Sequence, residues 1–481
     1  MKAYPFTRIA KVHDRNRFIT VEWTFYELFI GRFDTDLKGE KYSILKFGGT
    51  SVNSEDKLEM AYRSIAREVE HGFKTVAVVS AFRGVTDLLF QLTQKPKVNG
   101  EFYSEWRRLH IGCERHLPEG YDESLLGKVK ARAGFIAKSY DTPWAVDELL
   151  SMGESYSAHI LHGYLLGKGL KVGLMDFDDP DFPTLGDGEF GSARIDLELT
   201  RMACEKALKA RFRNLGCVIV PGMGCVSPLD GRVRVRRGAS DYVATALSYG
   251  LKARRLWILS DVNGIKAADS SIIKEAETVP YLTVGELLDA GALGAKNTNT
   301  RFFLPLTKHC PLETYFAKHD EMDGEKTRIV REELNSKSSA PVKLVAGREV
   351  LVYTFRGYDI EKYVLDVEQS LSEKYDFIRG GGFKRERFFA FFDLSQAPRI
   401  QRSIMEVKGD VEVSPSKMAI VGIVGEGMKR TKKVIERLGK ALGDINIVYT
   451  LDISRISAGV VLNKEDLKEA VERLYASFIK A

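Results

Sequence analysis

The sequence predicts an α/β protein in which a mainly parallel sheet lies between helices, followed by a C-terminal α+β region. Short apolar segments of strand length alternate with helical patterns, as expected for buried parallel strands. They are residues 43–47, 75–79, 172–175, 217–220 and 256–259. Beyond a polar connector, shorter strand and helix patterns alternate in two cycles, which is typical of a paired ferredoxin-like module.

The first strand-helix-strand unit has the clearest signals. A helix is predicted from about Ser54, which is a suitable N-cap, and acidic residues follow in its first turn. Gly72 lies just past the predicted helix end, directly before the strand at residues 75–79. Strand, helix and strand in this order predict a right-handed parallel crossover.

Two further segments have local signals. Residues 100–142 are rich in charged and aromatic residues and are predicted to form helical insertions on the substrate side of the domain. Residues 224–227 and 232–236 flank Asp230 and Gly231, a pair that favours a β-hairpin.

These patterns divide the chain into three regions. Residues 1–40 are an N-terminal extension, with a short strand predicted at residues 17–23, to which we assign no function. Residues 41–330 form the main α/β domain, residues 331–339 are the connector, and residues 341–481 form the C-terminal region. Its predicted strands are residues 341–355, 377–394, 417–424 and 445–453, and its predicted helices are residues 363–371, 432–442 and 464–479.

Composition limits the classes of protein to consider. The chain has 481 residues, 44% hydrophobic and 29% charged, which is the balance of an ordinary globular protein with more than one core. The surplus of 72 Lys and Arg over 66 Asp and Glu is too dilute to indicate a nucleic acid or an acidic membrane as partner. A local basic cluster, made up of Arg232, Arg234, Arg236 and Arg237, suggests a small anionic ligand instead.

The cysteines and the apolar segments indicate a cytoplasmic protein. The five cysteines are an odd number without a C-x-x-C pair, which favours buried thiols in a reducing compartment over disulfides or a zinc site. No stretch approaches the ~20 apolar residues of a membrane-spanning helix.

A glycine turn at residues 46–52 carries the first functional signal. It follows a predicted strand and precedes a helix, where backbone N–H groups can line a site for phosphate oxygens. Gly48 and Gly49 allow a close approach, Lys46 adds a cation for the transferring phosphoryl group, and Thr50 adds a hydroxyl. The segment alone is equally compatible with an ordinary turn and a surface lysine.

This turn resembles the N-terminal signature of the aspartate kinases, within the wider amino acid kinase family. Other segments resemble motifs of the same family in the same order along the chain. They are residues 78–87, the Gly-Glu pair at 153–154, the Arg-Gly-Ala-Ser-Asp-Tyr segment at 237–242, the nucleotide loop at 260–265 and residues 294–296. The matches occur from about residue 43 to the C-terminus, and the resemblance implies an amino acid kinase catalytic domain over residues 41–330.

The resemblance also implies an activity, in which the γ-phosphoryl group of ATP is transferred with Mg²⁺ to the β-carboxylate of L-aspartate. The product would be 4-phospho-L-aspartate, on the route to lysine, threonine and methionine. The implied site residues are Lys46 and Asp241 for catalysis; Thr86, Glu154, Arg237 and Ser240 for the substrate; and Lys46, Gly48, Gly49, Thr50, Ser260, Asp261, Lys266 and Lys296 for the nucleotide. No protein residue is expected to be a metal ligand.

The chemistry of these residue types agrees with the implied roles. An arginine at position 237 offers two parallel donors to the α-carboxylate, and Glu154 offers an anion for the α-ammonium group. Ser240 and Thr86 can donate hydrogen bonds to carboxylates. A carboxylate acceptor is already ionised at pH 7, so no strong general base is needed.

The chain departs from the family pattern in three places. Lys266 occupies the position where a tyrosine commonly lies near the adenine, Ala239 replaces a glycine, and residues 297–303 differ from the usual continuation. Two alternatives therefore stay open: an amino acid kinase for another acid, such as glutamate or N-acetylglutamate, and a catalytically weak amino acid sensor.

The C-terminal region resembles the paired ACT modules of the family. Residues 421–428 are the clearest match, whereas the first module lacks a recognisable effector loop. The resemblance implies a homodimer or higher oligomer built through residues 341–481, and it leaves open whether an amino acid effector binds.

Overall fold

A computed structural model describes residues 40–138, 142–236, 238–296, 298–319, 321–332, 342–356, 377–381, 387–393, 412–430 and 434–480. Residues 40–481 form one compact unit, and residues 1–39, with the strand predicted at 17–23, lie outside the described residues. Arg237 and the helix predicted at residues 363–371 lie outside them as well.

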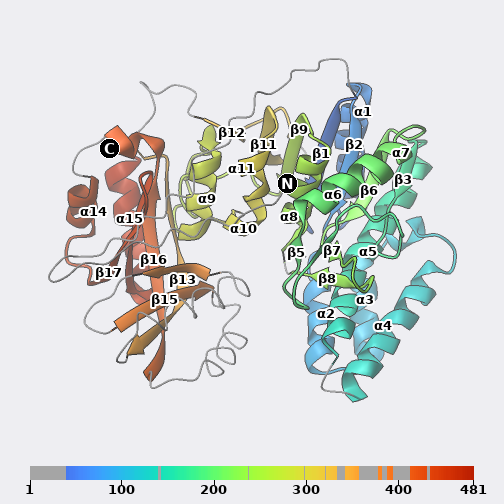
Figure 1. The fold of residues 1–481 in the computed structure, drawn as a ribbon, viewed down its shortest axis with the longest axis horizontal. Helices are drawn as coiled ribbons and strands as arrows, with labels where there is room; N and C mark the ends of the chain where they lie inside the picture. The colour runs from blue at the N-terminus through green and yellow to red at the C-terminus, as the bar shows by residue number, and fades with distance from the viewer. Residues whose placement is uncertain are drawn as a thin grey trace, which may run out of the picture. The chain divides into compact units, whose positions relative to one another are not determined.

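An eight-stranded sheet organises the main part of the chain (Figure 1). Its strands are β1 (Tyr42–Phe47), β2 (Lys74–Val79), β3 (Val172–Leu174), β6 (Cys217–Pro221), β9 (Arg255–Ser260), β10 (Tyr281–Thr283), β11 (Glu313–Lys318) and β12 (Lys326–Val330). Their order is β10-β12-β11-β9-β1-β2-β6-β3, and only the β11–β12 pair is antiparallel. The five predicted strands are thus confirmed as one parallel group.

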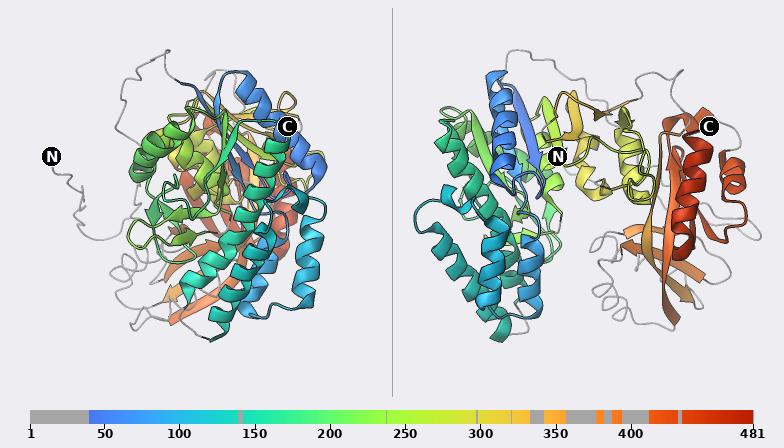
Figure 2. Two further views of the ribbon diagram at one scale, coloured as in Figure 1. Left: turned by 90° about the vertical axis from the view of Figure 1, so that its right-hand side faces the viewer. Right: turned by 180° about the vertical axis from the view of Figure 1, so that it is seen from behind.

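Helices cover this sheet and extend beyond it. They are α1 (Glu55–Glu70), α2 (Val85–Gln94), α3 (Gly100–His110), α4 (Tyr121–Lys138), α5 (Pro143–Gly167), α6 (Leu197–Ala203), α7 (Lys209–Arg211), α8 (Ser240–Gly250), α9 (Val284–Leu293), α10 (Thr300–Phe303) and α11 (Pro305–Lys308). Helices α2 to α5 pack together beside the sheet, which confirms the helical insertions predicted for residues 100–142 (Figure 2).

The local signals of the first unit are confirmed. The Ser54 side chain accepts a hydrogen bond from the backbone N–H of Lys57 and caps α1, and Leu58 and Ile65 on the inner face are fully buried. Gly72 has a φ of +80°, a left-handed conformation that favours glycine directly after the helix. The hairpin is confirmed too, as β7 (Gly224–Val226) and β8 (Val233–Val235).

The C-terminal part contains a six-stranded antiparallel sheet, in the order β14-β15-β13-β16-β18-β17. The elements are β13 (Leu344–Arg356), β14 (Phe377–Gly381), β15 (Arg387–Asp393), β16 (Glu412–Val424), β17 (Ile447–Ser454), β18 (Ser457–Asn463), α14 (Val434–Leu442) and α15 (Leu467–Phe478). Helix α15 packs on β13 and β16. The α+β prediction is confirmed, but the strand predicted at residues 377–394 is wrong because it is two paired strands, and β18 was not predicted.

Two smaller predictions have clear outcomes. All five cysteines are free, and Cys113, Cys204, Cys217 and Cys225 are buried, as expected of structural thiols. Among the described residues, no helix combines the length and apolar character needed to cross a membrane.

Candidate active site

The carboxyl ends of the central strands meet at one edge of the sheet. From β1 the chain proceeds towards β2 and β6, and from β9 it proceeds the other way towards β11, so the sheet has a switch point between β1 and β9. Ligands of open parallel sheets bind outside the carboxyl ends at such a point. The residues that follow β1, β2, β6 and β9 are therefore the natural candidates for a site.

The glycine turn after β1 packs against the loops beside it. Gly48 N–H donates to the Leu259 carbonyl at 3.3 Å, and Arg83 N–H donates to the Gly49 carbonyl at 3.0 Å. A Cβ on Gly49 would lie only 2.5 Å from the Ala81 carbonyl oxygen. Glycine is required here because the turn and the loop after β2 touch through their backbones.

Lys46 and Asp241 meet beside this turn. Lys46 belongs to β1 and Asp241 to the first turn of α8, and Nζ lies 2.8 Å from Oδ1 with both side chains largely buried. The Lys46 ammonium is also 3.8 Å from the position that a Cβ of Gly48 would take. The Lys46 ammonium is thus held beside the glycine turn by the Asp241 carboxylate, which belongs to α8.

The start of α8 approaches the sheet closely. A Cβ on Gly222, after β6, would lie 2.7 Å from the Cβ of Ser240, and the Ser80 hydroxyl donates to the Ser240 hydroxyl at 2.8 Å. Ala239 has a φ of −72° and a ψ of 0°, which any L-residue adopts. The alanine that replaces a family glycine therefore fits the backbone without strain.

A cavity of about 250 Å³ lies next to these groups. It is lined by Ser80, Ala81, Phe82, Arg83, Gly84, Thr86, Asp87, Glu154, Met223, Gly238, Ala239 and Ser240. The structure thus brings together Thr86, Glu154 and Ser240, three of the four predicted substrate residues. Arg83 and Met223 were missed by the sequence reasoning, although each follows shortly after a strand end, a position that could have marked it.

Glu154 is the most unusual group in the cavity. It lies on α5, where a Cβ on the preceding Gly153 would meet the Ala81 Cβ at 3.0 Å, so the helix packs tightly on the loop after β2. Burial raises the pKa of Glu154 from 4.5 to about 8, opposed by a hydrogen bond from the Ala81 backbone. Its Oε2 is buried with no hydrogen-bond partner among the described residues. An unpaired buried carboxylate oxygen is costly unless a ligand cation compensates it.

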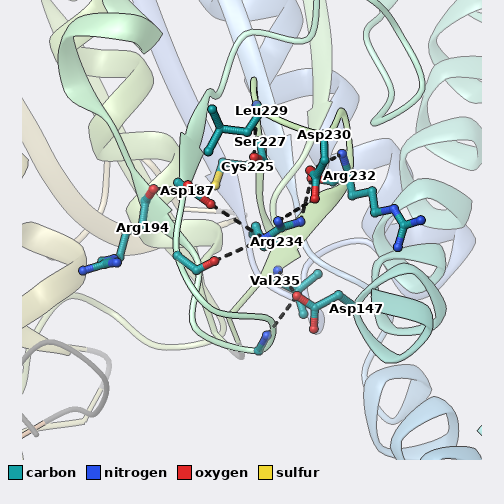
Figure 3. A network of polar contacts seen from close by, with 12 residues as sticks. Asp147, Asp187, Arg194, Cys225, Ser227, Leu229, Asp230, Arg232, Arg234 and Val235 are labelled. Atoms are coloured by element: carbon teal, nitrogen blue, oxygen red, sulfur yellow. Dashed lines mark hydrogen bonds and ion pairs between the residues drawn. The ribbon is translucent and has the colours of Figure 1, made fainter. Parts of the chain in front are cut away.

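Polar contacts attach the β7–β8 hairpin to α5 (Figure 3). Asp147 Oδ2 accepts from the backbone N–H groups of Gly191 and Val235, each at 2.9 Å. Arg234 is buried, bonds Asp230 at 2.8 Å and lies 3.9 Å from the centre of the Phe190 ring. The anion site predicted at the basic cluster is therefore wrong for Arg234, since its guanidinium is part of the hairpin's own packing.

The predicted nucleotide residues after β9 lie apart from the cavity lining. The Ser260 hydroxyl accepts from the Val262 N–H at 3.3 Å, and Asp261 is exposed. Lys266 Nζ donates to the Thr278 hydroxyl at 2.7 Å, and Lys296 Nζ lies 2.7 Å from Asp269 Oδ1. The described part of the chain has no group of three or more His, Cys, Asp or Glu side chains arranged to hold a metal.

Comparison with known proteins agrees with this architecture. The profile of the amino acid kinase family matches residues 41–312, and the chain belongs to that family. An aspartokinase of Geobacillus stearothermophilus is 25% identical over 447 residues, which cover 90% of this chain and 96% of that protein. An aspartate kinase of Stutzerimonas stutzeri is 24% identical over 448 residues, with 90% and 96% covered.

The solved structure of E. coli aspartokinase III with aspartate and ADP has the same fold. It superposes with a TM-score of 0.78 at 20% identity and covers 91% of this chain and 99% of that one. The same enzyme with lysine and aspartate gives a TM-score of 0.66, again with 91% and 99% covered. The shared fold includes the C-terminal α+β part.

Proposed function

We propose that this protein is an aspartate kinase, which transfers the γ-phosphoryl group of ATP to the β-carboxylate of L-aspartate. The observation that carries the proposal is the cavity beside the glycine turn, which Glu154, Ser240 and Thr86 line and where Oε2 of Glu154 is buried without a hydrogen-bond partner among the described residues. Such a cavity suits a small polar molecule with a cationic group. The similarity to aspartokinases along most of the chain supports aspartate as that molecule.

In this proposal the substrate is held by groups of opposite charge. The ionised Glu154 pairs with the α-ammonium group, Arg237 takes the α-carboxylate in a bidentate contact, and Thr86 and Ser240 donate to carboxylate oxygens. The free protein holds a proton on Glu154 at neutral pH because burial raises its pKa to about 8. Binding of the ammonium group stabilises the carboxylate form and releases that proton.

Phosphoryl transfer then depends on position and charge rather than on a base. The β-carboxylate oxygen is already anionic and attacks the γ-phosphorus in line, while the bond from that phosphorus to the β,γ-bridging oxygen breaks and ADP leaves. Lys46, oriented by Asp241 at 2.8 Å, stabilises the charge that develops on the phosphoryl oxygens. The backbone N–H groups of Gly48 and Gly49, with the Thr50 hydroxyl, complete the phosphate site.

The nucleotide is assigned to the loop after β9. Ser260 and Asp261 lie at the carboxyl end of that strand, while Lys266 and Lys296 would exchange their present protein partners for phosphate oxygens. Because the described residues lack a metal-holding cluster, Mg²⁺ would be held mainly by the phosphate oxygens of ATP, as is usual for this ion. Bound there, it neutralises phosphate charge.

The activity is tested by following ADP release with L-aspartate, L-glutamate, N-acetyl-L-glutamate or no acceptor. Release that depends on L-aspartate supports the proposal. Faster release with either glutamate compound would instead make the protein a kinase for another acid, and no acceptor-dependent release would make it a non-catalytic sensor.

The C-terminal sheet is proposed as the homodimer interface. Strand β17 lies at the sheet edge and exposes Ile447 and Val448, and such an edge can pair with a second copy. Light scattering of the protein and of an Ile447→Lys, Val448→Lys variant tests this, with a dimer and a monomer expected respectively. A dimeric variant would place the interface elsewhere.

We also propose that the boundary between the two domains lies near residue 330. Val345 N–H donates to the Ala267 carbonyl at 2.8 Å, and Lys343 pairs with the buried Glu286 at 2.8 Å, so the two parts share contacts.

An amino acid effector, if one binds, is expected near Gly425 and Gly427. Adding lysine, threonine or methionine singly to the activity assay tests for it.

A further inference from the structure

A buried histidine lies at the same edge of the sheet but outside the cavity. His319 directly follows β11 and is 2% exposed. Its backbone N–H donates to the Ser260 carbonyl at 3.0 Å, and its ring Nδ1 lies 2.6 Å from the same oxygen. The carbonyl at the end of β9 is therefore held by two donors from one residue.

The ring's two nitrogens have different partners. A carbonyl oxygen can only accept, so Nδ1 carries the hydrogen. The other nitrogen, Nε2, lies 2.5 Å from the Lys57 ammonium, which can only donate. The ring thus donates to Ser260 through Nδ1 and faces Lys57 through Nε2.

The ring also reaches the glycine turn after β1. Ser51 Oγ lies 3.4 Å from Nδ1, and the Ser51 N–H donates to the Gly48 carbonyl at 2.8 Å. Since β11, β9 and β1 are consecutive neighbours in the sheet, one side chain spans all three strand ends. It connects the turn that binds phosphate in our proposal with the first residue of the proposed nucleotide loop.

We propose that His319, held by Lys57, is a positioning residue for nucleotide binding. It does not touch the nucleotide, and it acts by fixing the Ser260 carbonyl and the Ser51 hydroxyl relative to each other. This rests on the proposed function only in taking these two loops as the nucleotide site. Removing the ring leaves the Ser260 carbonyl, which belongs to a half-buried residue, with one donor fewer, so the loop is held less firmly.

The test measures ADP binding by calorimetry in the absence of aspartate, together with the melting temperature of each variant. His319→Ala is expected to weaken ADP binding by about 10- to 100-fold, the effect of one buried hydrogen bond. His319→Asn keeps a donor near the position of Nδ1 and is expected to bind within about threefold of the parent. Lys57→Met removes the partner of Nε2 and keeps the ring, so it should lie between the two.

A matched control separates positioning from general loosening. Arg67 on α1 makes two 2.7 Å bonds to Asp323, which lies in the same segment after β11, but it does not reach Ser260. Arg67→Ala should therefore leave ADP binding within about twofold, as expected for an exposed pair.

The outcomes divide clearly. Parental ADP affinity in a folded His319→Ala protein would overturn the proposal, as would an asparagine variant as weak as the alanine variant or an equal loss in Arg67→Ala. If His319→Ala does not fold, the other two variants decide: parental ADP affinity in Lys57→Met, or a loss of tenfold or more in His319→Asn, would overturn the proposal. A protein that binds ADP but does not phosphorylate aspartate would contradict the proposed function and leave this inference standing, whereas one that does not bind ADP would end both.

Discussion

The substrate cavity and the nucleotide loop differ in how their charged groups are held. Glu154 on α5 is buried and Lys46 on β1 is largely buried, and Oε2 of Glu154 has no hydrogen-bond partner in the part of the chain that the structure describes. Lys296, by contrast, is 60% exposed and already paired with Asp269. In the free protein a proton on Glu154 offsets the cost of burying its carboxylate, and a ligand cation can replace that proton, while the loop cation exchanges one solvated partner for another.

This difference predicts which substitutions should have the largest effects on kinetics. Groups that are already desolvated and fixed in the free protein need no reorganisation when the ligand binds. Their substitution should therefore have large effects on kcat or KM. An exposed group must first break its contact with a protein partner, so each such group should contribute little to ligand binding. The variants below test this contrast.

The largest effect is expected for Lys46→Ala. The ammonium is aimed at charge that develops in the transition state, so kcat should fall by about 100- to 1,000-fold, with a smaller change in the KM for aspartate. Steady-state kinetics of the purified variant measure this, with Arg67→Ala as a control that removes a cation from α1 and leaves Lys46 in place. An unchanged kcat would remove Lys46 from the mechanism.

Glu154→Gln should act on substrate binding instead. The amide keeps the shape but cannot provide an anion for the ammonium group, so the KM for aspartate should rise by about 10- to 100-fold. The KM for ATP should stay within about twofold, since the nucleotide is bound elsewhere. Equal changes in both constants would show a general distortion and not a lost ammonium contact.

The parts that could be predicted from the sequence are those set by local patterns. The strands of the parallel sheet, the Ser54 cap and the glycine turn depend on apolar runs and neighbouring residue types, and all are found as expected. Residues such as Thr86 and Ser240 lie directly after strands or at helix starts, so topology alone brings them together.

What could not be predicted depends on contacts across the chain. Nothing local to His319 indicates that its ring would meet Ser51, which is 268 positions away. Arg234 looked like a ligand group in the sequence, yet Asp230 and Phe190 bury it. Lys296 likewise meets Asp269 and Ser271, which precede it by more than 20 positions.

A smaller effect is expected in the free protein's stability. Glu154 has a pKa raised from 4.5 to about 8 by burial, so between these values the folded state keeps a proton that the unfolded state releases. Stability therefore falls as pH rises through this window, by on the order of 1 kcal/mol per pH unit from this group. Urea unfolding from pH 5 to pH 8 should show a steeper fall in the parent than in Glu154→Gln. Parallel curves would contradict the raised pKa.

The smallest effect is expected for Lys296→Ala. Its ammonium is exposed, so losing one phosphate contact should raise the KM for ATP by about two- to fivefold, and less at high salt. The KM for aspartate should not change. A tenfold or larger rise would mean that Lys296 is as firmly positioned as the cavity groups, and the contrast between the two regions would then fail.

The most direct test of the account is the proton released when L-aspartate binds. Calorimetric titrations at pH 7 in buffers of different ionisation enthalpy count that proton. We expect the parent to release close to one proton per aspartate, because Glu154 is mainly protonated before binding and ionised after it. Glu154→Gln, titrated at aspartate concentrations that reach saturation, should release almost none. If the parent releases no proton, or if the variant releases as many, the buried carboxylate does not recognise the amino group and the proposed substrate site is wrong.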